Sequence, residues 1–364
     1  MGADISSIDE FESFQKNYFF QKQFVSENYG EIKSFKHPTT EHFIAIKTYL
    51  HQGVVDPKKL ELSAAEQKSM KHESLAECTH VFCNNHEELC GRFIKVHLVY
   101  DFYQRNLSQE IERRKNEHEF FVENEVVSLL YTVISGLLYL KSLKKCHGDI
   151  NPTHIMITKD GRFKISDVQF LTELDEYHRF FIGLGDHCYL SPILFQSLGH
   201  RSINPAHNSE KSCVFSLGMV IVHMGLLDFP KDVHNFDTFE INENGLKGRL
   251  NKKALGLYSE RMQKLLWKMV EFDEEFRIDY EGILKELDQC KINASIILER
   301  ELMENPKKYL DIHDMPTTNR MLRTSPAKTL ERETLFDLEE DVMLNVPNNL
   351  NQIYEKMFKS EAKI

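Results

Sequence analysis

Two aspartates in one short stretch constrain the fold of this chain more than any other feature. The segment 145–170 contains Asp149 and Asp167, which are 18 residues apart. Apolar runs at 155–157 and 163–165 lie between them, and each run has the length and the branched or aromatic residues of a short buried strand. Each aspartate is therefore expected beside a buried strand.

The residues around these aspartates resemble the catalytic loop and the metal-binding loop of the protein kinase superfamily. That family reads HRDLKPEN and DFG at the two places, whereas this chain reads HGDINPTH over 147–154 and DVQ over 167–169. The resemblance implies that Asp149 accepts the proton of the substrate hydroxyl and that Asp167 binds magnesium. His154 then occupies the position of the asparagine that binds a second magnesium ion.

The resemblance also implies the architecture. We expect an α+β fold of the bilobal protein-kinase type, with a small β-rich N-lobe over about 18–102 and a large helical C-lobe over about 103–290. A segment of 17 residues precedes this body, and residues 291–364 form a C-terminal extension.

The N-lobe pattern supplies the expected nucleotide-binding residues. Apolar and polar residues alternate over 18–35, a turn follows at 37–40, and the next strand ends at Lys47. Gly30 stands 17 residues before Lys47, where kinases place the third glycine of their phosphate-binding loop. The other two glycine positions hold Val25 and Glu27, so the grip on ATP phosphates is expected to be weakened.

A charged stretch over 62–83 predicts the helix whose glutamate pairs with the strand lysine in kinases. Glu77 is the preferred candidate because Val81 and Phe82 follow it as an apolar ridge, and Glu73 is the alternative. Both glutamates could instead belong to a solvated helix face.

Further landmarks follow in the order of the kinase family. A strand is predicted over 93–102, an amphipathic helix over about 122–143 and a buried helix over 213–227. The YLSP stretch at 189–192 resembles the family's APE region, and Arg277 stands where kinases hold an arginine that pairs with the APE glutamate. That glutamate position is Ile193 here.

Several substitutions argue against efficient phosphoryl transfer. Imidazole is a poor ligand for magnesium, so His154 removes a metal ligand, and Asn151 replaces the lysine that steadies the transferred phosphate. Gln169 replaces the DFG glycine, and Asp186 adds a negative charge. We therefore expect a pseudokinase that acts as a scaffold or allosteric partner, with ATP and magnesium binding weakened.

Two alternatives stay open. One is an active, divergent serine/threonine protein kinase. The other is a small-molecule kinase of the aminoglycoside or choline type, because those enzymes use HGD in the equivalent loop. The YLSP, FSLG and late-arginine landmarks favour the protein-kinase side.

Composition restricts the partners and the compartment. The net charge of -11 and a pI near 5.9 provide no basic stripe for nucleic acid. Seven scattered cysteines without a C-x-x-C pair fit an intracellular protein with reduced thiols, and a cytoplasmic location is expected.

The two ends of the chain carry the interaction signals. The start MGADIS matches the pattern for myristoylation of Gly2, which would bring the protein to a membrane only marginally because one acyl chain binds weakly. Near the other end, apolar residues recur at helical spacing over 350–358. This segment is expected to dock on a protein partner or on the chain's own body.

Overall fold

The computed structural model describes residues 8–26, 30–52, 57–88, 91–166, 188–200, 205–251 and 255–288. Contacts divide the chain into two units, Met1–Leu287 and Asp288–Ile364. All described residues except Asp288 lie in the first unit. The expectations for five single residues and one segment lie outside the described residues: Gly2, Glu27, Asp167, Gln169, Asp186 and 291–364.

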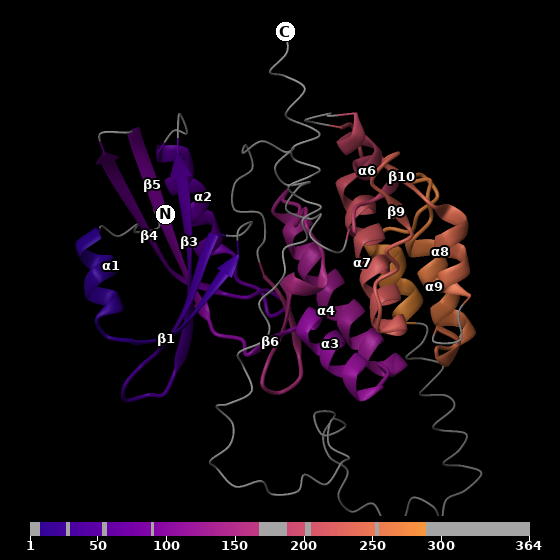
Figure 1. The fold of residues 1–364 in the computed structure, drawn as a ribbon, viewed down its shortest axis with the longest axis horizontal. Helices are drawn as coiled ribbons and strands as arrows, with labels where there is room; N and C mark the ends of the chain where they lie inside the picture. Colours follow the sequence, from indigo (N-terminus) through magenta and orange to yellow (C-terminus); the bar gives the residue numbers. More distant parts are fainter. Residues whose placement is uncertain are drawn as a thin grey trace, which may run out of the picture. The chain divides into compact units, whose positions relative to one another are not determined.

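A five-stranded antiparallel sheet forms the N-terminal part of the first unit. Its strands are β1 (Phe19–Ser26), β2 (Gly30–Lys36), β3 (Phe43–Gln52), β4 (Cys78–Glu88) and β5 (Gly91–Asp101). Their order is β1-β2-β3-β5-β4 (Figure 1). The hairpin and the lysine-bearing strand predicted from the alternation are therefore present, with Gly30 opposite Ser26 at the first pair of the β1–β2 ladder.

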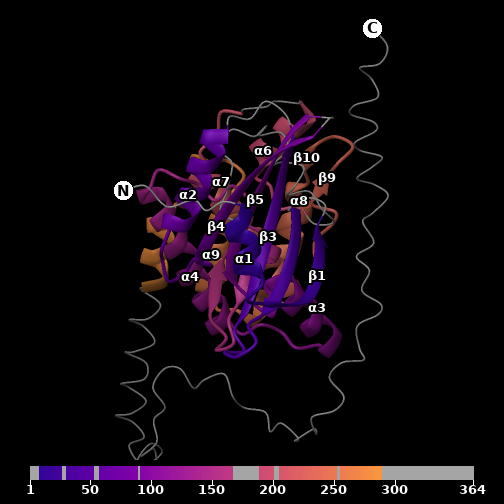
Figure 2. The same ribbon diagram turned by 90° about the vertical axis from the view of Figure 1, so that its left-hand side faces the viewer.

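The two faces of this sheet are covered by different helices. Because side chains alternate between faces, one face of the sheet presents residues such as Val81, Val96 and Leu98, which pack with Ala64 of α2 (Pro57–Ser69). The opposite face presents Ile44, Ile46, Phe35, Phe82 and Val99. Figures 1 and 2 show α1 (Ile8–Gln15) across this second face, on the side away from α2.

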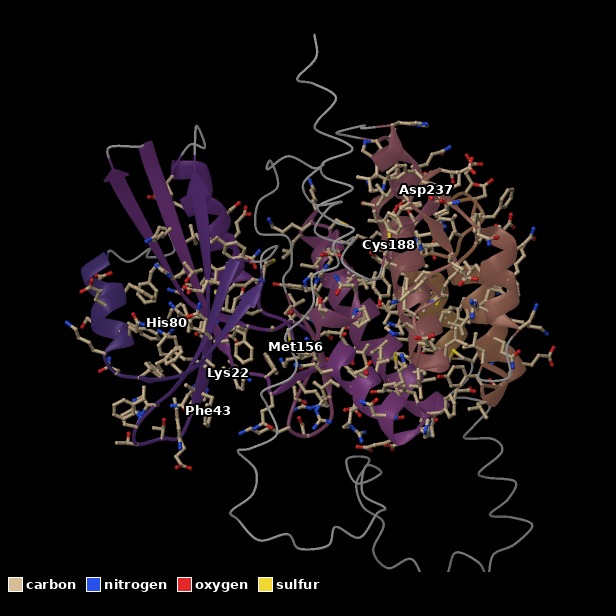
Figure 3. The ribbon with its side chains drawn as sticks, in the orientation of Figure 1. Lys22, Phe43, His80, Met156, Cys188 and Asp237 are labelled. Carbon is tan, nitrogen blue, oxygen red and sulfur yellow. The ribbon has the colours of Figure 1, made fainter. Side chains whose placement is uncertain are left out.

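The helix α1 was not expected from the sequence, although it lies within the segment 1–17. Its Phe11 ring stacks on His97 with centroids 3.9 Å apart, and its Phe14 ring lies 5.3 Å from Phe82 and 4.8 Å from His80. Figure 3 labels His80. This aromatic contact buries the sheet face that would otherwise meet water. Residues 8–15 of the N-terminal segment are thus part of the folded body.

The predicted helix over 62–83 is wrong in its second half. The helix α2 ends at Ser69, residues 70–77 form turns with a single bridge at Leu75, and β4 begins at Cys78. In β4 the apolar side chains alternate, with Val81 on the α2 face and Phe82 on the α1 face. What was interpreted as an apolar helix ridge is a strand that pairs with β5 along its length.

The C-terminal part of the first unit is mainly helical. It contains α3 (Leu107–Glu117), α4 (Glu123–Ser142), α6 (Pro192–Gly199), α7 (Ser209–Leu226), α8 (Glu243–Leu250), α9 (Glu260–Met269) and helical residues 280–288. Short helical turns lie at η1 (Pro152–His154) and η2 (Leu255–Leu257), and a two-stranded sheet joins β9 (His234–Asn235) to β10 (Glu240–Ile241). The predicted helices over 122–143 and 213–227 correspond to α4 and α7.

Both of these helices are core helices. α7 buries every residue from Ser212 to Gly225, and α4 buries Val126, Leu130, Val133 and Leu137 in the same core. α4 is long and apolar enough to cross a membrane by those two criteria, but its apolar positions face the protein core in the structure. The chain reaches the segment around Asp149 directly from the end of α4.

Candidate functional site

The catalytic-loop segment is built on a small three-stranded sheet. β6 (Arg105–Asn106) pairs with β7 (Ile155–Ile157), and β7 pairs with β8 (Phe163–Ile165). The two strands predicted between the aspartates are β7 and β8. Gly148 adopts a φ of 79°, a left-handed conformation that a side chain disfavours, so the HGD turn requires its glycine.

His147 fixes the start of this loop. Its Nε2 donates to the backbone oxygen of Ser166 at 2.8 Å, and its Nδ1 accepts from the backbone N–H of Asp149 at 3.3 Å. The side chain is only 1% exposed, so the two bonds place the imidazole proton on Nε2. His147 therefore ties the Asp149 loop to the residue that immediately precedes Asp167.

Asp149 is held by the two residues that replace kinase catalytic groups. Asn151 donates from Nδ2 to Asp149 Oδ1 at 2.9 Å, and its Oδ1 accepts from the backbone N–H of Thr153 at 2.9 Å. His154 donates from Nδ1 to the backbone oxygen of Asp149 at 2.9 Å. Asn151 and His154 are both buried, so these bonds fold the loop onto itself.

The donor atoms around Asp149 suit a second magnesium ion poorly. Magnesium prefers oxygen ligands in near-octahedral geometry, whereas His154 offers nitrogen and already donates from Nδ1 to the loop. Within the described ranges, no group of three or more His, Cys, Asp or Glu side chains could hold a metal ion. Asp167, the other expected ligand, lies outside the described residues.

Lys47 lies on the α2 face of the sheet. It is 4% exposed, stands opposite Ile32 of β2 and Leu98 of β5, and its Nζ lies 5.4 Å from the centroid of the Tyr49 ring. Two-residue alternation puts Lys47 and Tyr49 on the same face, opposite the face covered by α1. The helix α1 therefore does not lie over the face that carries Lys47.

Neither of the expected helix glutamates belongs to a helix. Glu77 directly precedes β4 and pairs with Lys71 at 3.0 Å on an exposed surface, and Glu73 lies in the turn between α2 and β4. The expected pairing of Glu77 with Lys47 is therefore not made in the structure. The physical reason is that α2 ends eight residues before Glu77, so no helical turn carries this carboxylate towards β3.

The segment 70–77 is instead fastened to the catalytic-loop sheet. Ala76 donates its backbone N–H to Ile165 at 2.8 Å, and Ile165 donates to Ser74 at 2.8 Å. Lys164 Nζ donates to the backbone oxygens of Glu73 at 2.9 Å and Leu75 at 3.1 Å. These bonds hold the segment that follows α2 against β8.

Near Asp149, the sequence analysis missed Cys188 and noted Tyr189 only as the start of the YLSP stretch. Both residues are buried, and Figure 3 labels Cys188 beside α7. Burial, together with the nearby charge of Asp149, raises the pKa of the Cys188 thiol to about 12. Burial and the neighbouring Cys188 and Asp149 also raise the pKa of Tyr189 well above its usual value. The Tyr189 hydroxyl lies 2.8 Å from Nδ1 of His223 in α7. The YLSP resemblance was the available signal, because it starts at Tyr189.

Arg277, which the resemblance matches to a kinase arginine, is buried near the first turn of α7, and the hydrogen bonds that it makes with described residues go to backbone oxygens. Its guanidinium donates to the backbone oxygens of Glu271 at 2.6 Å, Phe272 at 3.0 Å and Lys211 at 3.0 Å. It also lies 5.1 Å from the centroid of the Phe215 ring. Burial lowers the pKa of Arg277 to about 10, and nearby acidic residues oppose that shift.

Comparison with known proteins agrees with this architecture. The sequence model of the family described as "Protein kinase domain" matches residues 25–287, which cover strands β2 to β5, the catalytic loop and Arg277. The chain therefore belongs to the protein kinase domain family.

The similar curated proteins are kinases at low identity. The chain is 28% identical over 171 residues to cyclin-dependent kinase-like 1 of Caenorhabditis elegans, covering 46% of this chain and 45% of that protein. It is 22% identical over 284 residues to serine/threonine-protein kinase 16 of Rattus norvegicus, covering 75% of this chain and 90% of that protein. It matches only 24% of serine/threonine-protein kinase PLK4 of Drosophila persimilis, at 28% identity. The chain thus spans less than half the length of the first and third of these relatives.

Proposed function

We propose that this protein is a pseudokinase, a kinase-domain protein with impaired phosphoryl transfer that acts as a scaffold or allosteric partner. The observation that carries the proposal is the closed hydrogen-bonding of the loop 147–154. Asn151 and His154, which stand where kinases use a lysine and a metal-binding asparagine, both bond to Asp149.

The chemical argument concerns charge. In phosphoryl transfer, catalysis depends on positioning and on cations that offset charge at the transferred group. The loop HGDINPTH contains no lysine or arginine, and His154 donates its Nδ1 proton to the backbone of Asp149. A loop with this hydrogen bonding holds its shape, but it does little to neutralise the negative charge of the transition state.

The nucleotide side of the site is expected to be weak but not abolished. Lys47 is buried on β3, and resemblance gives it the phosphate-binding role together with Gly30. Glu77 contacts Lys71, so it does not support Lys47 as the helix glutamate does in kinases. We therefore propose that ATP binds weakly and that magnesium contributes little to its affinity.

The second candidate is an active, divergent serine/threonine kinase. It is favoured by the retained position of Asp149 after a fixed His147 and by the burial of Lys47 in the sheet. The relatives named as serine/threonine kinases also support this candidate. In this case Asp149 would orient an acceptor hydroxyl and Asn151 would only position it.

Transfer of radiolabelled phosphate from ATP distinguishes the two candidates. We expect the purified full-length chain with magnesium to label neither itself nor a generic protein substrate above the background of Asp149→Asn. Robust labelling that Asp149→Asn abolishes would overturn the pseudokinase proposal. Labelling of choline or an aminoglycoside, but not of protein, would instead support a small-molecule kinase.

A restoration variant serves as the matched control. The double change Asn151→Lys and His154→Asn returns both kinase-type groups to the loop while leaving Asp149 in place. If the loop chemistry limits the reaction, this variant should label a protein substrate at least about tenfold above wild type, which corresponds to about 1.4 kcal/mol of barrier. Thermal shift with ATP, with and without magnesium, measures binding separately.

The partners and the location are proposed from the two ends of the chain. We propose a protein partner for 291–364, through the apolar positions over 350–358, and a cytoplasmic location with membrane attachment when Gly2 is acylated. Replacing Ile353 and Phe358 by serine in the full chain should release the partner. Gly2→Ala should abolish flotation with vesicles if acylation carries the attachment.

A further inference from the structure

Two cysteines meet directly behind the catalytic loop. Cys146 immediately precedes His147, and Cys213 lies in the first half of α7. Their sulfur atoms are 3.4 Å apart, although 67 residues separate them in sequence. Among the described cysteines, which also include Cys78, Cys83 and Cys188, this is the pair whose sulfurs are in contact.

We propose that Cys146 and Cys213 are a reversible disulfide site that couples cellular oxidants to the catalytic loop. The sulfurs need to approach by about 1.4 Å to reach disulfide bond length. A change of this size lies within the reach of side-chain rotation and a small backbone shift, because Cys146 lies in an irregular segment between α4 and η1.

The difference in burial sets the order of the chemistry. Cys146 is half-buried, whereas Cys213 is 4% exposed, so an oxidant reaches Cys146 first. The hydrogen bond with Cys146 and burial both hold the pKa of Cys213 well above its usual value. The raised pKa keeps Cys213 mostly as the thiol and makes it slow to react with an oxidant. Its contact with Cys146 places it to attack the oxidised Cys146 sulfur, so it is the resolving thiol.

The proposed reaction uses a peroxide. Hydrogen peroxide converts the Cys146 thiol to a sulfenic acid and releases one water. The Cys213 sulfur then attacks the Cys146 sulfur, its proton leaves with the hydroxyl group as a second water, and the S–S bond forms. Two thiols are oxidised by two electrons and one peroxide is reduced to two waters. A small dithiol reverses the reaction by thiol–disulfide exchange.

The position of the pair gives the disulfide a consequence for the loop. Cys146 directly precedes His147, whose Nε2 donates to the backbone oxygen of Ser166 and whose Nδ1 accepts from the backbone N–H of Asp149. Bonding Cys146 to Cys213 draws the residue before His147 towards α7 and so acts on these two hydrogen bonds. Oxidation therefore acts within three residues of Asp149, and this holds whether or not the protein transfers phosphate.

Mass spectrometry of the full-length protein tests the link. Folded wild type is treated with hydrogen peroxide, its remaining thiols are alkylated, and it is digested without reductant. We expect a linked Cys146–Cys213 peptide that dithiothreitol removes, that Cys146→Ser abolishes and that Cys83→Ser retains. Cys83 is the matched control because it is also half-buried. Oxidation of Cys146 to a sulfinic acid without any linked peptide would overturn the proposal.

Hydrogen exchange tests the effect on the loop. Peroxide should change the exchange rate of the amides over 147–151 in wild type and leave them unchanged in Cys146→Ser. Equal exchange in oxidised and reduced wild type, with the linked peptide present, would refute the coupling to the catalytic loop. Cys213→Ser is used only if it unfolds with the same cooperativity as wild type, and the Cys146 variant is sufficient without it.

Discussion

The site of Arg277 and the loop of Asp149 both retain a charged residue of the kinase family after losing its expected partners. Arg277 lacks the glutamate at 193, and its guanidinium donates to backbone oxygens in the first turn of α7 and in the segment after α9. Asp149 lacks the lysine and asparagine, and it accepts from Asn151 and His154. The Arg277 hydrogen bonds reach 66 residues along the chain, whereas these two Asp149 hydrogen bonds lie within its own loop.

The two charged residues therefore have different roles in the structure. Arg277 donates to residues of α7 and of the segment after α9, so its removal leaves partly buried carbonyl groups in two separate segments without this donor. The Asp149 carboxylate accepts from the Asn151 amide in its own loop, and its charge also raises the pKa of Cys188 and Tyr189. We infer that Arg277 is required for folding and that Asp149 contributes little to stability.

The replacement of Arg277 by methionine is expected to have the largest effect. Methionine preserves apolar volume but provides no donor for the three carbonyl groups, so the free energy of unfolding should fall by about 3 kcal/mol. Urea unfolding measures the change. The control is Arg249→Met, which breaks a surface pair with Asp232 and should cost at most about 0.5 kcal/mol. An equal fall in the free energy of unfolding for both variants would show that Arg277 stabilises the fold no more than a surface arginine does.

Glu110 tests whether another buried charge behaves like Arg277. Burial alone would raise the pKa of Glu110, but hydrogen bonds from Arg113, Arg114 and Arg105 lower it to about 2. Glu110→Gln should cost about 2 kcal/mol near neutral pH. Glu243→Gln, in an exposed pair with Lys247, is the control and should change stability little.

The pH dependence of the Glu110 effect follows from the direction of its shift. The folded-state pKa lies below the usual value of 4.5, so the stabilisation is complete above pH 4.5 and is lost as the pH falls towards 2. The gap between wild type and Glu110→Gln should therefore narrow over that interval in urea titrations. If the difference in unfolding free energy between wild type and Glu110→Gln widened on acidification, the stabilisation would not come from the ionised Glu110 carboxylate.

His154→Ala is expected to have an intermediate effect. It removes the donor to the Asp149 backbone oxygen and leaves a small cavity at a side chain that is 3% exposed. The free energy of unfolding should fall by about 1.5 kcal/mol. His154→Asn retains an amide donor and should recover part of this loss. If asparagine is no better than alanine in thermal or urea unfolding, His154 does not stabilise the loop through this bond.

Asp149→Asn is expected to have the smallest effect on stability. An amide can replace the carboxylate oxygen that accepts from Asn151, so the free energy of unfolding should change by about 0.5 kcal/mol or less. A loss comparable with that of Arg277→Met would show that both charges serve the fold. The same urea experiment provides this comparison.

The sequence predicted those elements that depend on local periodicity. The alternation over 18–35 corresponds to β1 and β2, and the strand predicted to end at Lys47 is β3, which continues to Gln52. The helical spacing over 122–143 corresponds to α4. The prediction of a continuing helix was wrong after Ser69 because the charged residues that follow have no distinctive hydrophobic period. Residues 78–88 form a strand because they pair with β5. α1 was missed because a helix of eight residues is too short to be stable by itself. It is stabilised by the packing of Phe11 and Phe14 on the sheet.

Sequence by itself determined the chemistry available in the catalytic loop, because the absence of lysine and the presence of histidine at 154 are facts of composition at fixed spacing. Only the tertiary structure decided which groups meet. Cys146 contacts Cys213, and Arg277 donates to the backbone oxygen of Lys211, because packing against α7 brings together residues more than 60 positions apart in the chain. Glu77 pairs instead with its near neighbour Lys71. Spacing along a sequence specifies local elements, whereas contacts between elements depend on how their buried faces pack.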